Sequence, residues 1–304
     1  MNVQKNIWQI ITFALLLAFL TLNLLFKIEI TPRWKNVSAS NETSEAGIAA
    51  KKGVDWEEKL YPVGGAELAV RWGDLGQKLI AKGVIDKDKF ENLYAQRGGM
   101  DVYEKSLIYG TVDGKLKITG ENSGFLLNIF WALGLSNKNS ILDTGPMRDK
   151  RYGGAENFAS TGGWSVAKGN TMDHYSKYNF IVLTPAQQTL VEKVAQNIYR
   201  PCCDNSTYFP DCNHGMAMLG FLELMASQGA TEQEMYSNAL TLNSYWFPAT
   251  YPAVAQYLEK IGTSWDKTSP QEILGVNYSS SSGFRQILSK INPAQSKGGP
   301  GCGV

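Results

Sequence analysis

Apolar residues recur at helical spacing in the first half of the chain. Four of them are three or four positions apart: Leu68, Trp72, Leu75 and Leu79. This spacing predicts a helix with one apolar face that ends at Gly83. Asp86 is suited to cap the short helix that follows. Ser123 is expected to cap a strongly apolar helix over 124–135, which we expect to be the buried centre of this half.

A β-hairpin is expected next to this helical region. The alternating segments 107–112 and 115–119 flank the dipeptide Asp113-Gly114, and Asp-Gly favours a tight turn with positive φ. Residues 137–180 are rich in Gly, Asn and Ser and show little periodicity. They predict a long loop, and ordered loops of this length are uncommon unless they serve a function.

The second half of the chain has clear helix signals. Thr184, Pro185 and Gln187 form an N-cap, a proline at the first helical position and a capping glutamine. The predicted helix runs to about Tyr199, because Pro201 stops it.

Further helices are expected after the cysteines. One begins at Asn213 or His214 and continues through Met225, and Thr231 with Glu234 opens another. Two shorter helices are predicted over about 251–261 and 283–291.

The predicted fold is therefore mainly α-helical, an α+β protein in which an N-terminal transmembrane anchor precedes a helical domain with a small β-hairpin. The expected segments are a membrane anchor (1–35), a flexible linker (36–54), a helical region with hairpin and long loop (55–180), and a helical Cys/His domain with a Gly-rich Cys tail (181–304).

Composition narrows the function classes. The chain has 304 residues, 43% of them apolar, and carries 29 basic and 28 acidic side chains for a formal net charge of +1. A chain of this length and apolar content can bury a sizeable core. No basic patch stands out, so we expect no nucleic-acid partner.

The N-terminus predicts a membrane anchor. Ile7–Phe26 contains no charged residue and, as a helix, spans about 30 Å, the thickness of a bilayer's hydrocarbon core. No small-residue cleavage site follows, which favours a retained anchor over a cleaved signal peptide. The basic residues around the span do not favour an outside domain. However, the short tail before the span is typical of a signal anchor. We expect a single-pass protein of the cell membrane with an extracytoplasmic domain.

The candidate chemistry lies between Cys202 and Met218. This segment holds three of the four cysteines and one of the two histidines. The predicted metal ligands are Cys202, Cys203, Cys212 and His214, with Met218, His174 or Cys302 as further candidates. Thiolate, imidazole and thioether donors suit copper(I) or zinc. Two predicted helix ends bring these donors together.

Two other interpretations of the cysteines stay open. An extracytoplasmic domain permits two disulfides, such as Cys203–Cys212 and Cys202–Cys302. Alternatively, Cys202 or Cys203 with Cys212 forms a redox-active pair. We identify no carboxylate beside the cluster to act as a general base, so metal binding, storage or delivery is favoured over catalysis.

A local resemblance covers Tyr199–Phe247. In this stretch cysteines precede a helix, a Gly-x-Thr-x-x-Glu helix start follows, and the end is aromatic. The residues concerned are Pro201-Cys202-Cys203, Asp211-Cys212, Gly229-Ala-Thr231-Glu-Gln-Glu234 and Tyr245-Trp246-Phe247. The stretch resembles exported proteins with a Pro-Cys-Tyr-Cys-Gly-Cys motif and the thiol subunit of cytochrome c maturation. The resemblance implies a membrane-anchored helical module that presents thiols outside the cell membrane.

Overall fold

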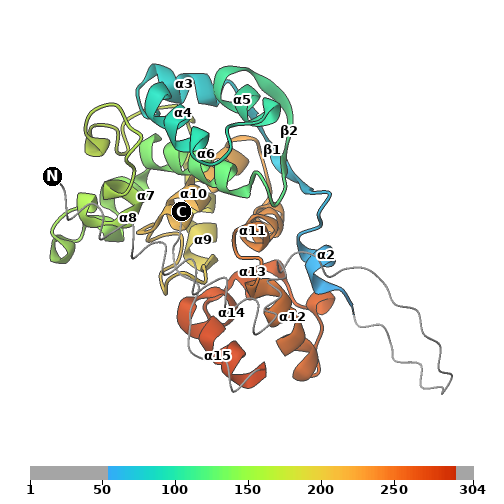
Figure 1. Cartoon of the computed structure of the whole chain (residues 1–304). Coiled ribbons are helices and arrows are strands. Elements are labelled where there is room, and N and C mark those ends of the chain that lie inside the picture. The colour runs from blue at the N-terminus through green and yellow to red at the C-terminus, as the bar shows by residue number, and fades with distance from the viewer. Residues whose placement is uncertain (1–53, 292–304) are drawn as a thin grey trace, which may run out of the picture. The chain divides into compact units, whose positions relative to one another are not determined.

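The computed structural model describes residues 54–291, which form many helices and one pair of strands (Figure 1). The helices are α2 (Trp56–Leu60), α3 (Leu75–Ala81), α4 (Lys87–Ala95), α5 (Val102–Tyr109), α6 (Ser123–Ser136), α7 (Ser140–Thr144), α8 (Ala159–Gly162), α9 (Pro185–Asn197), α10 (Asn213–Ser227), α11 (Glu232–Trp246), α12 (Thr250–Lys260), α13 (Pro270–Leu274), α14 (Val276–Ser279) and α15 (Ser281–Ile291). The strands are β1 (Ala66–Gly73) and β2 (Val112–Ile118). The 3-10 turns are η1 (Pro146–Arg148), η2 (Lys150–Tyr152), η3 (Ala155–Asn157), η4 (Thr171–Asp173) and η5 (Trp265–Lys267).

Several predicted features fall outside this range. The anchor Ile7–Phe26, the linker as far as residue 53 and the tail with Cys302 are not among the described residues. Within residues 54–291, no helix combines the length and the apolar character needed to cross a bilayer.

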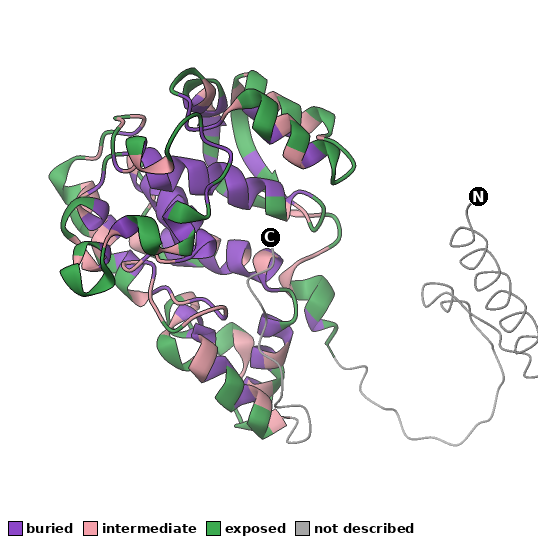
Figure 2. Ribbon diagram, turned by 60° about the vertical axis from the view of Figure 1, so that its left-hand side comes forward, coloured by how far each residue is buried: buried purple, intermediate pink, exposed green. Residues whose placement is uncertain are grey.

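The core is organised around the packing of α6 against α10. Every residue of α10 from Asn213 to Ala226 is buried, and α6 is buried from Phe125 to Ser136. The outer helices alternate buried and exposed positions, as Figure 2 shows by colour. The apolar helix expected over 124–135 is therefore confirmed as the buried centre of its region.

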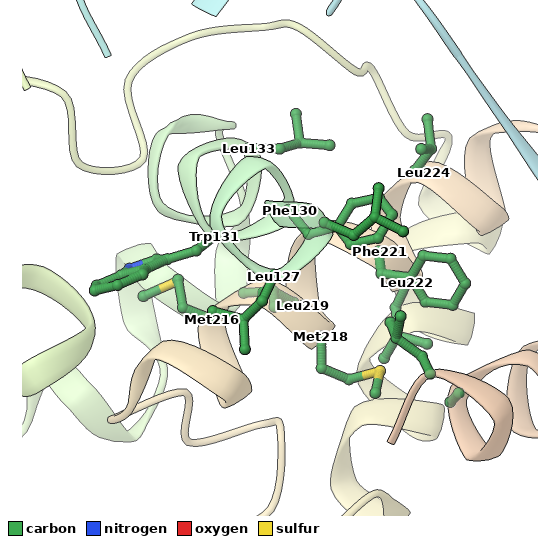
Figure 3. Packing of buried hydrophobic residues seen from close by; sticks show 14 of the residues in the cluster. Leu127, Phe130, Trp131, Leu133, Met216, Met218, Leu219, Phe221, Leu222 and Leu224 are labelled. Carbon is green, nitrogen blue, oxygen red and sulfur yellow. The ribbon is translucent and has the colours of Figure 1, made fainter. Parts of the chain in front are cut away.

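Two glycines allow α6 and α10 to approach backbone to backbone. A Cβ atom at Gly134 would overlap the carbonyl oxygen of Met216, and one at Gly220 would overlap that of Phe130. The side chains on either side interdigitate, with Phe130 and Phe221 in ring contact at a centroid distance of 5.1 Å (Figure 3). Such close packing makes dispersion contacts along both helices.

The small antiparallel sheet is present, but its strands differ from the predicted hairpin. β2 pairs with β1, so that Leu68 lies opposite Leu116, and α3, α4 and α5 intervene between the two strands. Residues 102–109 are helical because Asp101 and Glu104 form a capping box. Asp113-Gly114 lies within β2, next to an irregularity in the register, and makes no hairpin turn.

The helix predicted from Leu68 to Leu79 is also corrected. Leu68, Val70 and Trp72 are the buried positions of β1, and the helix itself begins only at Leu75. Residues four apart lie on one face of a strand as well as of a helix, so the pair Leu68 and Trp72 fits both.

Three of the four helix starts predicted from capping residues are confirmed. Thr184 and Thr231 each form the predicted capping box, and the Asp86 side chain accepts a hydrogen bond from the amide of Lys89. Ser123 is instead the first helical residue, after Asn122. The shorter helices predicted near 251–261 and 283–291 correspond to α12 and α15.

The segment 137–180 is more ordered than a plain loop. It contains α7, α8 and four of the 3-10 turns. Asn137 and Asn139 bind it to α10, since both side-chain amides donate to the carboxyl group of Glu223, at 3.0 and 2.5 Å. The segment therefore packs against the core helices.

Candidate metal centre

Three of the predicted ligands form one cluster. The Sγ atoms of Cys202, Cys203 and Cys212 all lie within 4.8 Å of one another. The Sγ atoms of Cys202 and Cys212 are 3.6 Å apart. Two thiolates bound at about 2.3 Å to a tetrahedral zinc ion lie about 3.8 Å from each other. The three cysteines are therefore close enough to hold a metal ion.

The imidazole of His214 lies next to these sulfurs. Its Nδ1 lies 3.9 Å from the Sγ atom of Cys202. The ring packs on the end of α11, with its centroid 4.5 Å from that of Phe247 and 5.8 Å from that of Trp246. This packing fixes the plane of the imidazole beside the cluster.

The loop that carries the cysteines is folded back on α9. α9 ends at Asn197, the amide of Thr207 donates to the carbonyl of Ile198, and the amide of Tyr208 donates to that of Ala195. This turn returns the chain to Cys212, the residue before α10. The two helix ends thus meet as the sequence predicted.

Arg200 is the central polar residue of the site, and the sequence analysis missed it. It is only 1% exposed. Its Nε donates to Cys212 Sγ at 3.0 Å, and its Nη2 donates to Asp211 Oδ1 at 2.5 Å. The other guanidinium contacts are the carbonyl oxygens of Asn205 and Phe209. All of its polar contacts are therefore acceptors in the cysteine loop.

Gly215 makes room for this guanidinium. A Cβ atom at that position would lie 2.5 Å from the Cζ atom of Arg200. The signal in the sequence is that charged residues lie close to the cysteines, Arg200 two positions before Cys202 and Asp211 directly before Cys212.

Asp211 corrects the expectation that no carboxylate lies beside the cluster. Its Oδ1 is 3.9 Å from Cys203 Sγ. However, Arg200 binds that oxygen and the Asn205 amide donates to the other at 2.8 Å. Because both oxygens are occupied, Asp211 orients Arg200 and is not free as a general base.

The three thiols differ in acidity. Hydrogen bonds from Cys202 and Cys203, together with the nearby Arg200 guanidinium, hold the pKa of Cys212 well below its usual value. Hydrogen bonds to Cys203 and Cys212, together with burial, raise the pKa of Cys202. For Cys203 the contact with Cys202 lowers the pKa, but the contact with Cys212 and burial prevail and raise it to about 12. Cys212 is therefore the most acidic of the three thiols.

Phe209, in the loop between Cys203 and Cys212, packs on the segment 137–180. The Phe209 ring lies 5.3 Å from both Tyr152 and Phe158, centroid to centroid. The amide of Ser160 donates to the carbonyl of Asp211. The segment therefore fixes the loop that carries the thiols.

His174 and Met218 are not placed in the cluster. Both ring nitrogens of His174 are hydrogen bonded elsewhere, at 2.9 Å, to the Tyr178 hydroxyl and the Lys168 carbonyl. Met218 is 1% exposed and belongs to the hydrophobic core (Figure 3). Packing accounts for Met218, and local hydrogen bonds account for His174. Cys302 lies outside the described residues.

Comparison with known proteins finds no match: the chain matches no family model, no curated protein and no solved structure. The resemblance of Tyr199–Phe247 to thiol-bearing exported proteins stays a prediction from the residues alone. Function must therefore be argued from the geometry of the site.

Proposed function

We propose that this protein binds a soft metal ion, zinc or copper(I), through Cys202, Cys203 and Cys212. The observation that supports the proposal is the convergence of three sulfurs within 4.8 Å of one another. Thiolates are the ligands that copper(I) and zinc prefer. The buried Arg200 guanidinium adds a positive charge beside the sulfurs, which offsets part of the negative charge of a three-thiolate centre.

The need for His214 as a ligand distinguishes zinc from copper(I). Zinc in structural sites takes four ligands, and we assign the fourth to the Nδ1 atom of His214, at 3.9 Å from Cys202 Sγ. Copper(I) is satisfied by three thiolates in a plane. Zinc therefore requires His214, whereas copper(I) does not.

We further propose that the domain is held at the cell membrane by Ile7–Phe26 on the extracytoplasmic side. There the metal would be bound, stored or delivered rather than used in catalysis, because both oxygens of the adjacent Asp211 are occupied. Protease treatment of intact cells tests the placement. Degradation of the domain supports it, and full protection contradicts it.

The test of the metal site is Cys212→Ser in full-length protein purified without chelators. We expect bound metal in the parent and none in the variant, measured by elemental analysis together with a count of free thiols. The two histidines provide a matched pair. His214→Asn should weaken zinc affinity by at least about tenfold, and His174→Asn should leave it unchanged. Unchanged metal content in Cys212→Ser would overturn the proposal.

A second candidate function is thiol–disulfide exchange, favoured by the 3.6 Å between the sulfurs of Cys202 and Cys212 and by the lowered pKa of Cys212. The Cys212 thiolate would attack a substrate disulfide and release one thiol. The Cys202 thiol would then lose its proton and displace the second, leaving a Cys202–Cys212 disulfide and two substrate thiols. Oxidised glutathione is a suitable probe. Loss of two protein thiols without bound metal supports exchange, and a third outcome, no free thiols before treatment, supports structural disulfides.

A further inference from the structure

A cavity of about 250 Å³ borders the cysteine cluster through one shared residue, His214. Its lining includes the polar residues Arg97, Ser123, Asn213 and His214 and the aromatic residues Tyr245 and Trp246, and the Tyr245 hydroxyl donates to the carbonyl of Pro62. Among the described residues, no carboxylate lines it. The cavity is thus lined by hydrogen-bond donors and one guanidinium, without a negative charge to repel an anion.

The cavity is bordered by the N-termini of both core helices. Ser123 and Gly124 are the first two residues of α6, and Asn213 and His214 are the first two of α10. Neither Asn122 nor Cys212 caps its helix with a side-chain hydrogen bond. Apart from the His214 amide, which donates to Asn213 Oδ1, the first-turn amides and the positive ends of two helix dipoles favour an anion at this place.

Asn213 supplies a second, independent observation. The residue is only 5% exposed and lines the cavity. Its Oδ1 accepts from the amide of His214 at 3.0 Å, but its Nδ2 has no partner among the described residues. Buried side-chain amides are normally hydrogen bonded, so this donor calls for an acceptor inside the cavity.

We propose that the cavity binds a small oxyanion, a carboxylate or a phosphate, between Asn213 Nδ2, Arg97 and the first turns of α6 and α10. Its volume corresponds to about eight water molecules, which limits the ligand to a small organic acid or inorganic phosphate. The donors used here are not thiols. Anion binding therefore does not require that the cysteine cluster take up metal.

The test is calorimetric titration of metal-free, full-length protein with sodium malonate and, separately, sodium phosphate. Sodium chloride at matched ionic strength is the blank. Heat with malonate only identifies a carboxylate site, heat with phosphate only identifies a phosphate site, and heat with both identifies a general oxyanion site. No heat above the chloride blank with either anion, up to tens of millimolar, would overturn the proposal.

Asn213→Asp is the decisive variant. It keeps the shape of the side chain and suits a first helical turn, but replaces the donor with a negative charge. We expect at least about tenfold weaker binding. The matched control is Asn277→Asp, at an exposed first-turn position of α14 outside the cavity, and it should bind as the parent does. Arg97→Gln, an exposed change, should weaken binding by about fivefold at most.

Undiminished binding in Asn213→Asp would contradict the assignment of the site. Thermal unfolding of each variant shows whether it is folded, and Arg97→Gln provides a second check if Asn213→Asp is not. Cys212→Ser should retain anion binding, so that failure of the metal site and failure of the anion site are distinguishable.

Discussion

Helix α10 carries two buried polar sites that balance charge in different ways. At its N-terminal end, the Arg200 guanidinium lies between the Cys212 sulfur and the Asp211 carboxylate. In its interior, Glu223 is 0% exposed, and within residues 54–291 its side chain pairs with no cation and is bound only by the side-chain amides of Asn137 and Asn139. Burial raises the pKa of Glu223 well above its usual value, against the effect of both amides.

This difference in charge pairing gives the two sites different roles. The site at Arg200 is suited to chemistry, and the site at Glu223 is suited to holding the structure together. Hydrogen bonds from Cys202 and Cys203, with the Arg200 guanidinium beside them, lower the pKa of Cys212 and so favour its ionised form. An unpaired buried carboxyl favours its neutral form and acts as a hydrogen-bonding group. Glu223 therefore ties the segment 137–180 to the core, while Arg200 adds to the interactions that favour the ionised form of Cys212.

The largest expected effect comes from removing the cation. Arg200→Met leaves Asp211 and the Cys212 thiolate without a buried partner, which should lower the free energy of unfolding by about 3–5 kcal/mol. Urea denaturation of metal-free protein measures this loss. Arg285→Met, at an exposed residue of α15, is the control and should change stability little. A loss in Arg200→Met no larger than in the control would show that the guanidinium does not balance the site.

A smaller effect is expected at the unpaired carboxyl. Glu223→Gln places an amide donor against an Asn donor, because the Oδ1 atoms of Asn137 and Asn139 already accept from Ile181 and Gln188. We expect a loss of about 1–3 kcal/mol at acidic pH.

The pH dependence of stability sharpens this test. Because the folded protein holds the proton of Glu223 more tightly than the unfolded chain does, its contribution to stability is complete below the usual carboxyl pKa. That contribution decreases as the pH rises towards the raised folded value. The decrease should disappear in Glu223→Gln and persist in Glu259→Gln, an exposed control on α12. An identical pH profile for parent and Glu223→Gln would mean that folding does not raise the pKa of Glu223 and would contradict the prediction.

The smallest effect is expected from removing a side-chain amide that donates a hydrogen bond to one of the two carboxyl groups. Asn205 donates to Asp211, and Asn137 donates to Glu223. Asn205→Ala removes one hydrogen bond from Asp211, whose other oxygen still binds Arg200 and whose side chain is 20% exposed to water. We expect a loss of about 0.5–1.5 kcal/mol. Asn137→Ala should destabilise more, because it leaves the Oε2 atom of the buried Glu223 and the amide of Ile181 without their partner in the core. Equal losses in chemical denaturation would refute the difference between the two sites.

Local signals in the sequence were enough for the helices of the second half. The capping boxes at Thr184 and Thr231 act between residues three apart, so they can be recognised without tertiary information. The apolar helix α6 was recognised because nearly every one of its positions is buried. The strand β1 was missed because its partner β2 begins 39 positions after it ends, and no local pattern indicates that pairing.

By itself, the sequence determined which donors lie close together, since three cysteines and a histidine fall within a short segment between two helices. Only the tertiary structure decided which of them meet. His174 is held by local hydrogen bonds and Met218 lies in the hydrophobic core, whereas Arg200 and Asp211 are part of the site. The physical reason is that a buried charge requires a partner of opposite sign within hydrogen-bonding distance, and the folded path of the chain determines that distance.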